Sequence, residues 1–113
     1  MRIYLVTISD IPSFESDEKF KDFIVENKYE WWRYMPLVWA LATPDSVTTN
    51  SLIAKITECY GAIFSFVLEI DVKDVGGVYP ASKEMVENMP KGWTPFEWFA
   101  KVRDPNYVPS WNR

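Results

Sequence analysis

The sequence predicts an α+β fold in which four strands form an antiparallel sheet and two helices cover one of its faces. Three observations lead to this prediction. Stretches rich in β-branched and aromatic residues alternate with stretches whose apolar residues recur at helical spacing. Their order is strand, helix, strand, strand, helix, strand, with short links. The chain has 113 residues, 48% of them apolar, which is enough for one domain to bury a core.

The first strand and the first helix are expected within residues 2–28. Residues 2–9 are β-prone and alternate in part, and Pro12 ends the pattern. Ser16 is a suitable helix cap, because the acidic residues that follow it favour the positive end of the helix dipole. The apolar face of this helix consists of Phe20, Phe23 and Ile24.

Two further strands are expected in residues 29–43, which are too aromatic and β-prone for a helix. Pro36 cannot donate a hydrogen bond to a strand ladder, so we place a bulge or a tight bend there. The first of these strands should lie at an edge of the sheet and the second should be more buried. This arrangement places Trp31, Trp32 and Trp39 on adjacent strands.

A second helix and a fourth strand follow. Thr48 or Thr49 can cap the helix, and Gly61 stands where a helix end favours a left-handed residue. Residues 62–71 form the strand. The predicted apolar face of the helix comprises Leu52, Ile53, Ile56, Cys59 and Tyr60, which makes Cys59 a core residue.

The remaining residues predict a helical extension. Residues 82–89 allow about two helical turns. Thr94, Pro95 and Glu97 combine a cap, a first-turn proline and a glutamate three residues after the cap, which predicts a short helix to about Arg103. We expect its inward residues to be Phe96, Phe99 and Ala100. The last ten residues have no periodicity, yet Trp111 suggests that they dock on this chain or on a second one.

This order of elements is that of a ferredoxin-like βαββαβ fold. The first strand should be central, flanked by the third and the fourth, with the second at an edge. We expect residues 1–113 to form a single domain, with a core at 1–71 and a C-terminal helical extension and tail at 72–113. One face of the sheet then lacks a cover of helices.

Composition limits the classes of function. The net charge of −4 and a pI near 4.8 oppose the attraction to phosphates that nucleic-acid binders usually show. A single cysteine excludes an internal disulfide and fits a reducing cytosol. No run approaches the roughly 20 apolar residues that span a bilayer. We therefore expect a cytoplasmic, acidic protein with no membrane contact.

Aromatic side chains are the main candidate binding groups. With 17% aromatic residues, the chain has more rings than a core of this size needs, which indicates a homodimer or a protein partner. Rings on an open sheet can also stack a nucleotide while an arginine binds its phosphate. The alternative is that these tryptophans pack inside the protein. The candidate binding residues are Trp31, Trp32, Arg33, Tyr34, Trp39 and Trp111.

The chain also resembles a family. Its opening Tyr-Leu-Val-Thr-Ile-Ser-Asp, the segment around Trp31 and Trp32 with the following Val-Trp-Ala-Leu, and Gly-Trp-Thr-Pro-Phe-Glu-Trp-Phe at 92–99 look like small SinR-like proteins. The resemblance covers roughly residues 1–99. It implies a ferredoxin-like fold similar to the small CRISPR adaptation nuclease and to VapD-type ribonucleases, which form dimers through their sheets.

Asp10 is the candidate catalytic residue that this resemblance implies. In those nucleases a carboxylate after the first strand of each protomer meets its counterpart and can hold a divalent metal such as Mg²⁺. Ser9 stands where the family usually has tyrosine, and Asp10 can instead bond a backbone amide of a turn. We therefore rank a dimeric binding or regulatory module first, with no catalytic residue, no metal and no cofactor. A metal-dependent endoribonuclease ranks second, and an acidic inhibitor of a nucleic-acid-binding protein third.

Overall fold

The computed structural model describes residues 1–76, 87–88 and 94–113. The chain divides into two compact units. One consists of Met1–Asp71 together with Val108–Arg113, and the other of Val72–Tyr107. The first unit contains the sheet and is the larger of the two.

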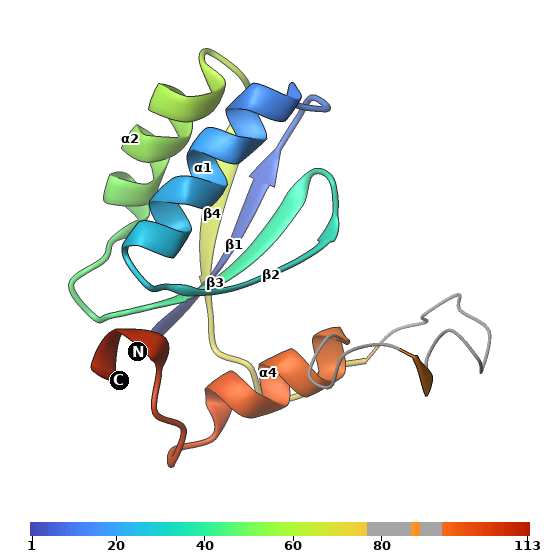
Figure 1. Cartoon of the computed structure of the whole chain (residues 1–113), viewed down its shortest axis with the longest axis vertical. Coiled ribbons are helices and arrows are strands. Elements are labelled where there is room, and N and C mark those ends of the chain that lie inside the picture. Colours follow the sequence, from blue (N-terminus) through green and yellow to red (C-terminus); the bar gives the residue numbers. More distant parts are fainter. Residues whose placement is uncertain (77–86, 89–93) are drawn as a thin grey trace. The chain divides into compact units, whose positions relative to one another are not determined.

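The first unit is built on a four-stranded antiparallel sheet (Figure 1). The strand order is β2-β3-β1-β4, so the first strand is flanked by the third and the fourth while the second lies at an edge, as predicted. The predicted α+β class is confirmed. The fourth strand begins at residue 65 rather than at residue 62, the start that the sequence predicts. The strands are β1 (Arg2–Ile8), β2 (Glu30–Met35), β3 (Val38–Thr43) and β4 (Ser65–Ile70).

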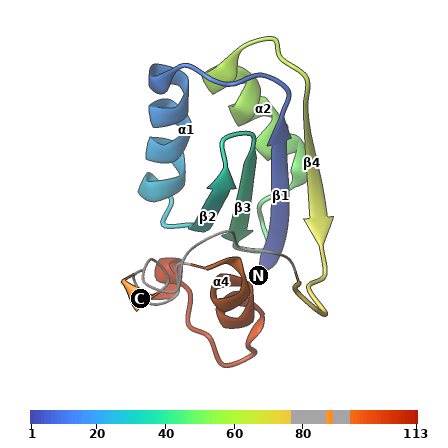
Figure 2. The same cartoon turned by 90° about the vertical axis from the view of Figure 1, so that its right-hand side faces the viewer.

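Two helices, α1 (Phe14–Glu26) and α2 (Thr49–Tyr60), lie on one face of the sheet (Figures 1 and 2). The predicted cap of α1 is wrong. Ser13 rather than Ser16 is the cap, because the Ser13 hydroxyl accepts the backbone N–H of Ser16 and so starts the helix one turn earlier.

The second helix begins and ends as the sequence predicts. Thr48 caps it: the Thr48 hydroxyl accepts the backbone N–H of Ser51, and the Ser51 hydroxyl accepts the backbone N–H of Thr48. Two backbone N–H groups at the start of the helix are satisfied in this way. Gly61 follows the helix with a φ of 80°, a conformation that side-chain-bearing residues rarely adopt.

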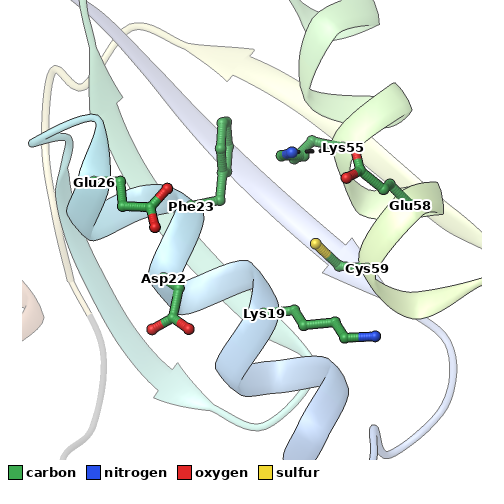
Figure 3. Close-up of a pocket in the computed structure, with 7 residues that line it drawn as sticks. All are labelled: Lys19, Asp22, Phe23, Glu26, Lys55, Glu58 and Cys59. Carbon is green, nitrogen blue, oxygen red and sulfur yellow. Dashed lines mark hydrogen bonds and ion pairs between the residues drawn. The ribbon is translucent and has the colours of Figure 1, made fainter.

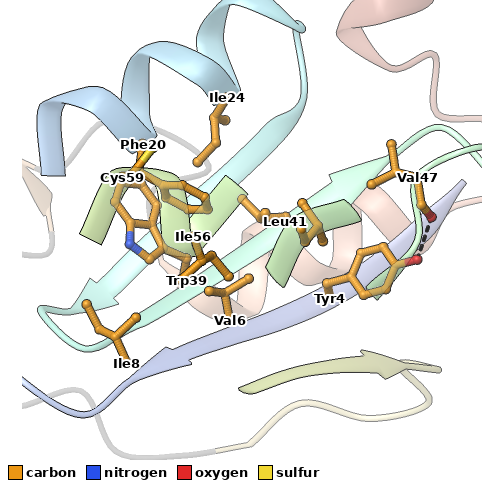
Figure 4. Packing of buried hydrophobic residues seen from close by; sticks show 11 residues of the cluster. Tyr4, Val6, Ile8, Phe20, Ile24, Trp39, Leu41, Val47, Ile56 and Cys59 are labelled. Atoms are coloured by element: carbon orange, nitrogen blue, oxygen red, sulfur yellow. Dashed lines mark hydrogen bonds between the residues drawn. The ribbon is translucent and has the colours of Figure 1, made fainter. Parts of the chain in front are cut away.

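The core lies between the sheet and these two helices (Figure 4). Phe20 packs edge-on against Trp39, with ring centroids 5.4 Å apart. The buried Tyr4 satisfies its hydroxyl by donating to the carbonyl of Val47 at 2.7 Å. Cys59 is buried, as predicted. The other core residues are Val6, Ile8, Ile24, Leu41, Leu52 and Ile56.

The second unit contains α4 (Pro95–Arg103). Thr94 caps it by accepting the backbone N–H of Glu97, and the helix ends at the predicted residue. The predicted inward residues are wrong: Trp98 and Val102 are buried, whereas Phe96 and Phe99 are half-buried and Ala100 is exposed. Trp98 and Val102 are four positions apart, so they share one stripe of the helix.

The helical turns expected at residues 82–89 fall almost wholly outside the described residues. Over the part of the chain that is described, no helix has both the length and the apolar character that crossing a membrane requires.

Candidate functional site

Cross-strand pairing determines which side chains share a face of the sheet. Val6 is opposite Trp39 and Val67, and all three lie on the side of the helices. Residues directly opposite one another in an antiparallel pair point to the same face, so the next residues along each strand define the opposite face. We call this the outer face. Its residues are Ile3, Leu5, Thr7, Glu30, Trp32, Val38, Ala40, Ala42, Phe66, Leu68 and Ile70.

The outer face carries large exposed apolar side chains along β4. Phe66 is 57% exposed and Leu68 is 49% exposed. Phe64, directly before the strand, is 88% exposed and continues the same alternation. We call these three residues the β4 patch. Solvent contact of this extent at neighbouring apolar side chains is typical of an interaction surface.

More exposed apolar side chains lie in the segment after β1. Ile11 and Phe14 are both more than three-quarters exposed. The backbone N–H of Ser9 donates to the carbonyl of Phe64 at 2.9 Å, so this segment and the β4 patch start from the same end of the sheet. A shallow depression of about 260 Å³ lies there, lined by Thr7, Ile8, Ser9, Phe64, Ser65 and Phe66.

The tryptophans predicted to bind a partner are divided between the two faces. Trp39 is 1% exposed and belongs to the core. Trp31 is 36% exposed on the same side, with its ring centroid 5.5 Å from that of Trp39. Trp32 is half-buried and lies on the outer face. Of the three tryptophans, Trp32 is therefore the one that lies on the same face of the sheet as the β4 patch.

Arg33 is engaged within the protein. One of its guanidinium nitrogens lies 2.7 Å from a carboxylate oxygen of Asp17, and the group stacks over the Trp39 ring at 4.3 Å. A second nitrogen donates to the carbonyl of Pro36. These contacts direct the guanidinium toward α1 and the hairpin turn rather than toward a phosphate on the outer face.

Asp17 also accepts a hydrogen bond of 2.8 Å from the hydroxyl of Tyr60. Burial, followed by this hydrogen bond, raises the pKa of Tyr60, because both disfavour a negative phenolate beside a carboxylate. Two buried donors nearby, Nε of Arg33 and Nε1 of Trp39, have no acceptor in the part of the chain that is described. Asp17, Arg33, Trp39 and Tyr60 form the polar cluster that closes the β2–β3 side of the core.

The last two candidate binding residues lie in β2 and at the end of the chain. Tyr34 belongs to β2. Trp111 is half-buried in a short 3-10 turn, Ser110–Asn112. Both the backbone N–H and the hydroxyl of Ser110 donate to one oxygen of Glu30, at 3.0 and 2.6 Å. The turn around Trp111 is therefore attached to the sheet of its own chain.

Asp10 is exposed in the bend that follows β1. Its carboxylate makes no hydrogen bond or ion pair with the described residues, so the turn contact expected from the sequence is absent among them. Nor do the described residues contain a group of three side chains suited to a metal ion.

Two other strand-end acids lie at the end of the sheet opposite Asp10. Asp45 follows β3 and Asp71 follows β4, and both strands run antiparallel to β1. The amino group of Met1 lies 2.6 Å from a carboxylate oxygen of Asp45. Hydrogen bonding and charge from that amino group lower the pKa of Asp45.

A cleft of about 360 Å³ separates α1 from α2 (Figure 3). Lys55 lies 3.1 Å from Glu58 and 5.1 Å from the centre of the Phe23 ring. Burial raises the pKa of the Cys59 thiol, which keeps it protonated. The other residues that line the cleft are Lys19, Asp22 and Glu26, so charges of both signs alternate around it.

Comparisons with protein-family models, with curated proteins and with solved structures each gave no match. The candidate site therefore depends on this chain's own geometry.

Sequence reasoning missed the β4 patch. Alternation separates Phe64, Phe66 and Leu68 from Glu69, but it does not say which set faces the helices. The polar character of Ser65 and Glu69 favours the opposite assignment, because it predicts that their side of the strand faces solvent, whereas Val67 of that same side packs against the core.

Proposed function

We propose that this chain is a small homodimeric binding module of ferredoxin-like fold that associates through the outer face of its sheet. The order of elements, the strand order β2-β3-β1-β4 and the placement of two helices on one face support the fold assignment. The resemblance to SinR-like proteins agrees with it. The protein or nucleotide partner is then recognised by the assembled dimer.

The observation that carries this proposal is the exposure of the β4 patch. Fully burying a Leu or Phe side chain contributes about 1.5–3 kcal/mol, and Phe64, Phe66 and Leu68 each expose about half of their surface or more. Covering even part of this surface in each of two protomers therefore supplies several kcal/mol toward association. Polar side chains at these positions would not.

The aromatic residues predicted from the sequence then have different roles. Trp32 lies on the outer face and is the candidate aromatic anchor, with Trp111 near the start of β2. Trp39 and Arg33 stabilise the β2–β3 hairpin instead. Trp31 lies on the side of α1, where it packs on Trp39.

The test is the solution mass by sedimentation equilibrium across a range of protein concentrations. We expect the wild type to be dimeric, Phe66→Lys to be largely monomeric, and Trp32→Ala to be weakened. Val25→Lys is the matched control, because Val25 is also a half-exposed apolar residue but lies on α1. A wild type that is monomeric at every concentration, or a Val25→Lys variant that dissociates as readily as Phe66→Lys, contradicts the proposal.

The two other functions expected from the sequence have less support. A ribonuclease based on Asp10 requires a carboxylate from a second copy, because the described residues of one chain contain no group of three side chains suited to a metal ion. An acidic inhibitor requires carboxylates gathered on one exposed surface, whereas acids and lysines alternate around the cleft between α1 and α2.

A further inference from the structure

We infer that the dimer forms by antiparallel pairing of β4 with β4 of a second copy, which joins the two sheets into one. This inference rests on the proposed dimer and specifies its interface. Unlike packing of the two outer faces against each other, this pairing brings only the β4 side of the outer face to the interface and leaves Trp32, on the opposite edge strand, outside it, so Trp32→Ala distinguishes the two arrangements. Backbone direction, side-chain register and the contrast between the two sheet edges support it.

The direction of the backbone groups shows which N–H and C=O groups of β4 point away from β1, toward a possible partner strand. Ile8 donates its N–H to Leu37 beside β3, and Ser9 donates to Phe64 beside β4. Hydrogen-bonded residues alternate along an antiparallel ladder, so Phe66 and Leu68 turn their backbone groups toward β1. The N–H and C=O groups of the intervening residues, Ser65, Val67 and Glu69, point away from β1.

A two-fold axis through Val67 pairs all three of these residues. Val67 then faces the partner's Val67, and Ser65 faces the partner's Glu69, which allows about six interchain backbone hydrogen bonds. The Ser65 hydroxyl can donate to the partner's Glu69 carboxylate. On the outer face Phe66 lies opposite the partner's Leu68, so the two β4 patches become one continuous apolar strip.

The position of Glu69 favours this register over its neighbours. An axis at residue 69 would oppose two carboxylates, and an axis at residue 66 or 68 would place Glu69 opposite the partner's Ile63 or the partner's Val67. An axis at residue 65 would leave Glu69 outside the paired strands. The axis at Val67 gives this carboxylate a hydroxyl partner, while Arg2 of its own chain stays 3.5 Å away.

The other edge of the sheet favours a closed dimer over an open chain of molecules. The ladder between β2 and β3 is irregular between Trp32 and Met35, and Pro36 follows directly. Such bulges and prolines blunt an edge. β4 pairs regularly with β1 over its whole length, and no described strand pairs with its other edge. That edge is therefore suited to a strand of the same kind, and pairing β4 with β4 closes the assembly at two copies.

The test is a charge series at position 65, measured by sedimentation equilibrium. Ser65→Glu places a carboxylate opposite the partner's Glu69 twice in each dimer, and we expect the dissociation constant to rise at least tenfold. Ser65→Lys places a long charged side chain at the same position but with the opposite charge, so the dimer should be as stable as the wild type or more so. Combining Ser65→Glu with Glu69→Lys should restore the dimer. Circular dichroism verifies that each variant folds.

A disulfide tests the axis directly. Opposite residues of a hydrogen-bonded pair have Cα atoms about 5.5 Å apart, within the range that a disulfide allows. In a Cys59→Ser background, Val67→Cys should therefore cross-link under mild oxidation. Leu68→Cys is the control, since the two copies of that residue are offset along the strands and should cross-link poorly.

The outcomes separate this inference from the proposed function. A monomeric wild type overturns both. A dimer that Phe66→Lys dissociates, but that responds equally to Ser65→Glu and Ser65→Lys and does not cross-link through Val67→Cys, overturns the β4 pairing alone and leaves association through the outer face.

Discussion

The two edge strands of the sheet, β2 and β4, differ in the regularity of their hydrogen-bond ladders. At the β2 edge the ladder is interrupted between Trp32 and Met35, Pro36 ends the strand, and the turn at Ser110 is bonded to Glu30. At the β4 edge the ladder is regular from Ser65 to Ile70. Natural sheets usually blunt an exposed edge, so an edge left regular, with Phe66 and Leu68 exposed beside it, indicates a surface kept for contact.

The aromatic residues follow the same division. On the β2–β3 side, Trp39 is enclosed by Phe20, Trp31 and Arg33. On the β4 side, Phe64 and Phe66 are largely exposed. Residues of one chemical class therefore stabilise the monomer at one edge and are available to a partner at the other. Removing one residue from each group is a direct way to test this difference.

The largest effect is expected for Trp39→Ala. Truncating a buried tryptophan removes its transfer free energy and leaves a cavity, which should lower the free energy of unfolding by about 3–5 kcal/mol. Urea denaturation followed by circular dichroism measures this change. Phe64→Ala is the matched control, and its unfolding free energy should stay within about 0.5 kcal/mol of the wild type. Equal losses for the two variants would contradict the division of roles between the edges.

A smaller effect is expected for Tyr60→Phe, which removes the hydroxyl from the polar cluster. The bond to Asp17 joins a hydroxyl to a charged group, and such bonds contribute about 1.5–3 kcal/mol. Because Arg33 still pairs with Asp17, we expect a loss at the lower end of this range in urea denaturation at neutral pH. A variant as stable as the wild type would show that the cluster does not close this side of the core.

The same variant changes the response to alkaline pH. The pKa of Tyr60 is raised in the folded protein, so above the ordinary tyrosine pKa of about 10 the unfolded chain loses this proton first. The contribution of Tyr60 to the free energy of unfolding is therefore fully present below about pH 10 and is lost as the pH rises above this value. In the Tyr60→Phe variant, stability should therefore decline less steeply at alkaline pH. Part of the decline should remain, because burial also raises the pKa values of Tyr29 and Cys59. Melting temperatures measured between pH 8 and 11 test it.

Sequence reasoning succeeded where local chemistry decides the structure. The caps Thr48 and Thr94 and the bend at Pro36 each depend on a few neighbouring residues, and each was predicted. The start of α1 was missed because Ser13 and Ser16 are both good caps, and the choice between them depends on how the chain leaves β1. Local signals of equal strength do not decide between two such positions.

The candidate site was harder to predict, because it depends on contacts between distant segments. The sequence shows that Arg33 is near Trp31 and Trp32, but not that Asp17 of α1 binds its guanidinium. Alternation in β4 gives two faces without saying which one the helices cover. In α4, apolar residues occupy several stripes, so the pattern alone did not select Trp98 and Val102.

At the β2 edge, Ser110→Ala should have a modest effect. It removes the 2.6 Å hydroxyl contact to Glu30 and leaves the backbone N–H contact, which predicts a loss of about 1 kcal/mol or somewhat more. Hydrogen exchange should become faster at the turn around Trp111 and at the start of β2, with no change at β4. Faster exchange at β4 as well would mean that the two edges are not independent.

The smallest effect on stability is expected for Asp10→Asn. The carboxylate is exposed and makes no contact with the described residues, so the unfolding free energy should change by less than about 0.5 kcal/mol. The dimer mass should also stay the same, because Asp10 lies before the exposed residues Ile11 and Phe14 and outside the β4 ladder. Both quantities are measured with and without Mg²⁺, together with cleavage of a labelled RNA. Magnesium-dependent cleavage that Asp10→Asn abolishes would favour the ribonuclease and give this end of the sheet a catalytic role, whereas cleavage that persists in the variant would exclude Asp10 as its metal ligand.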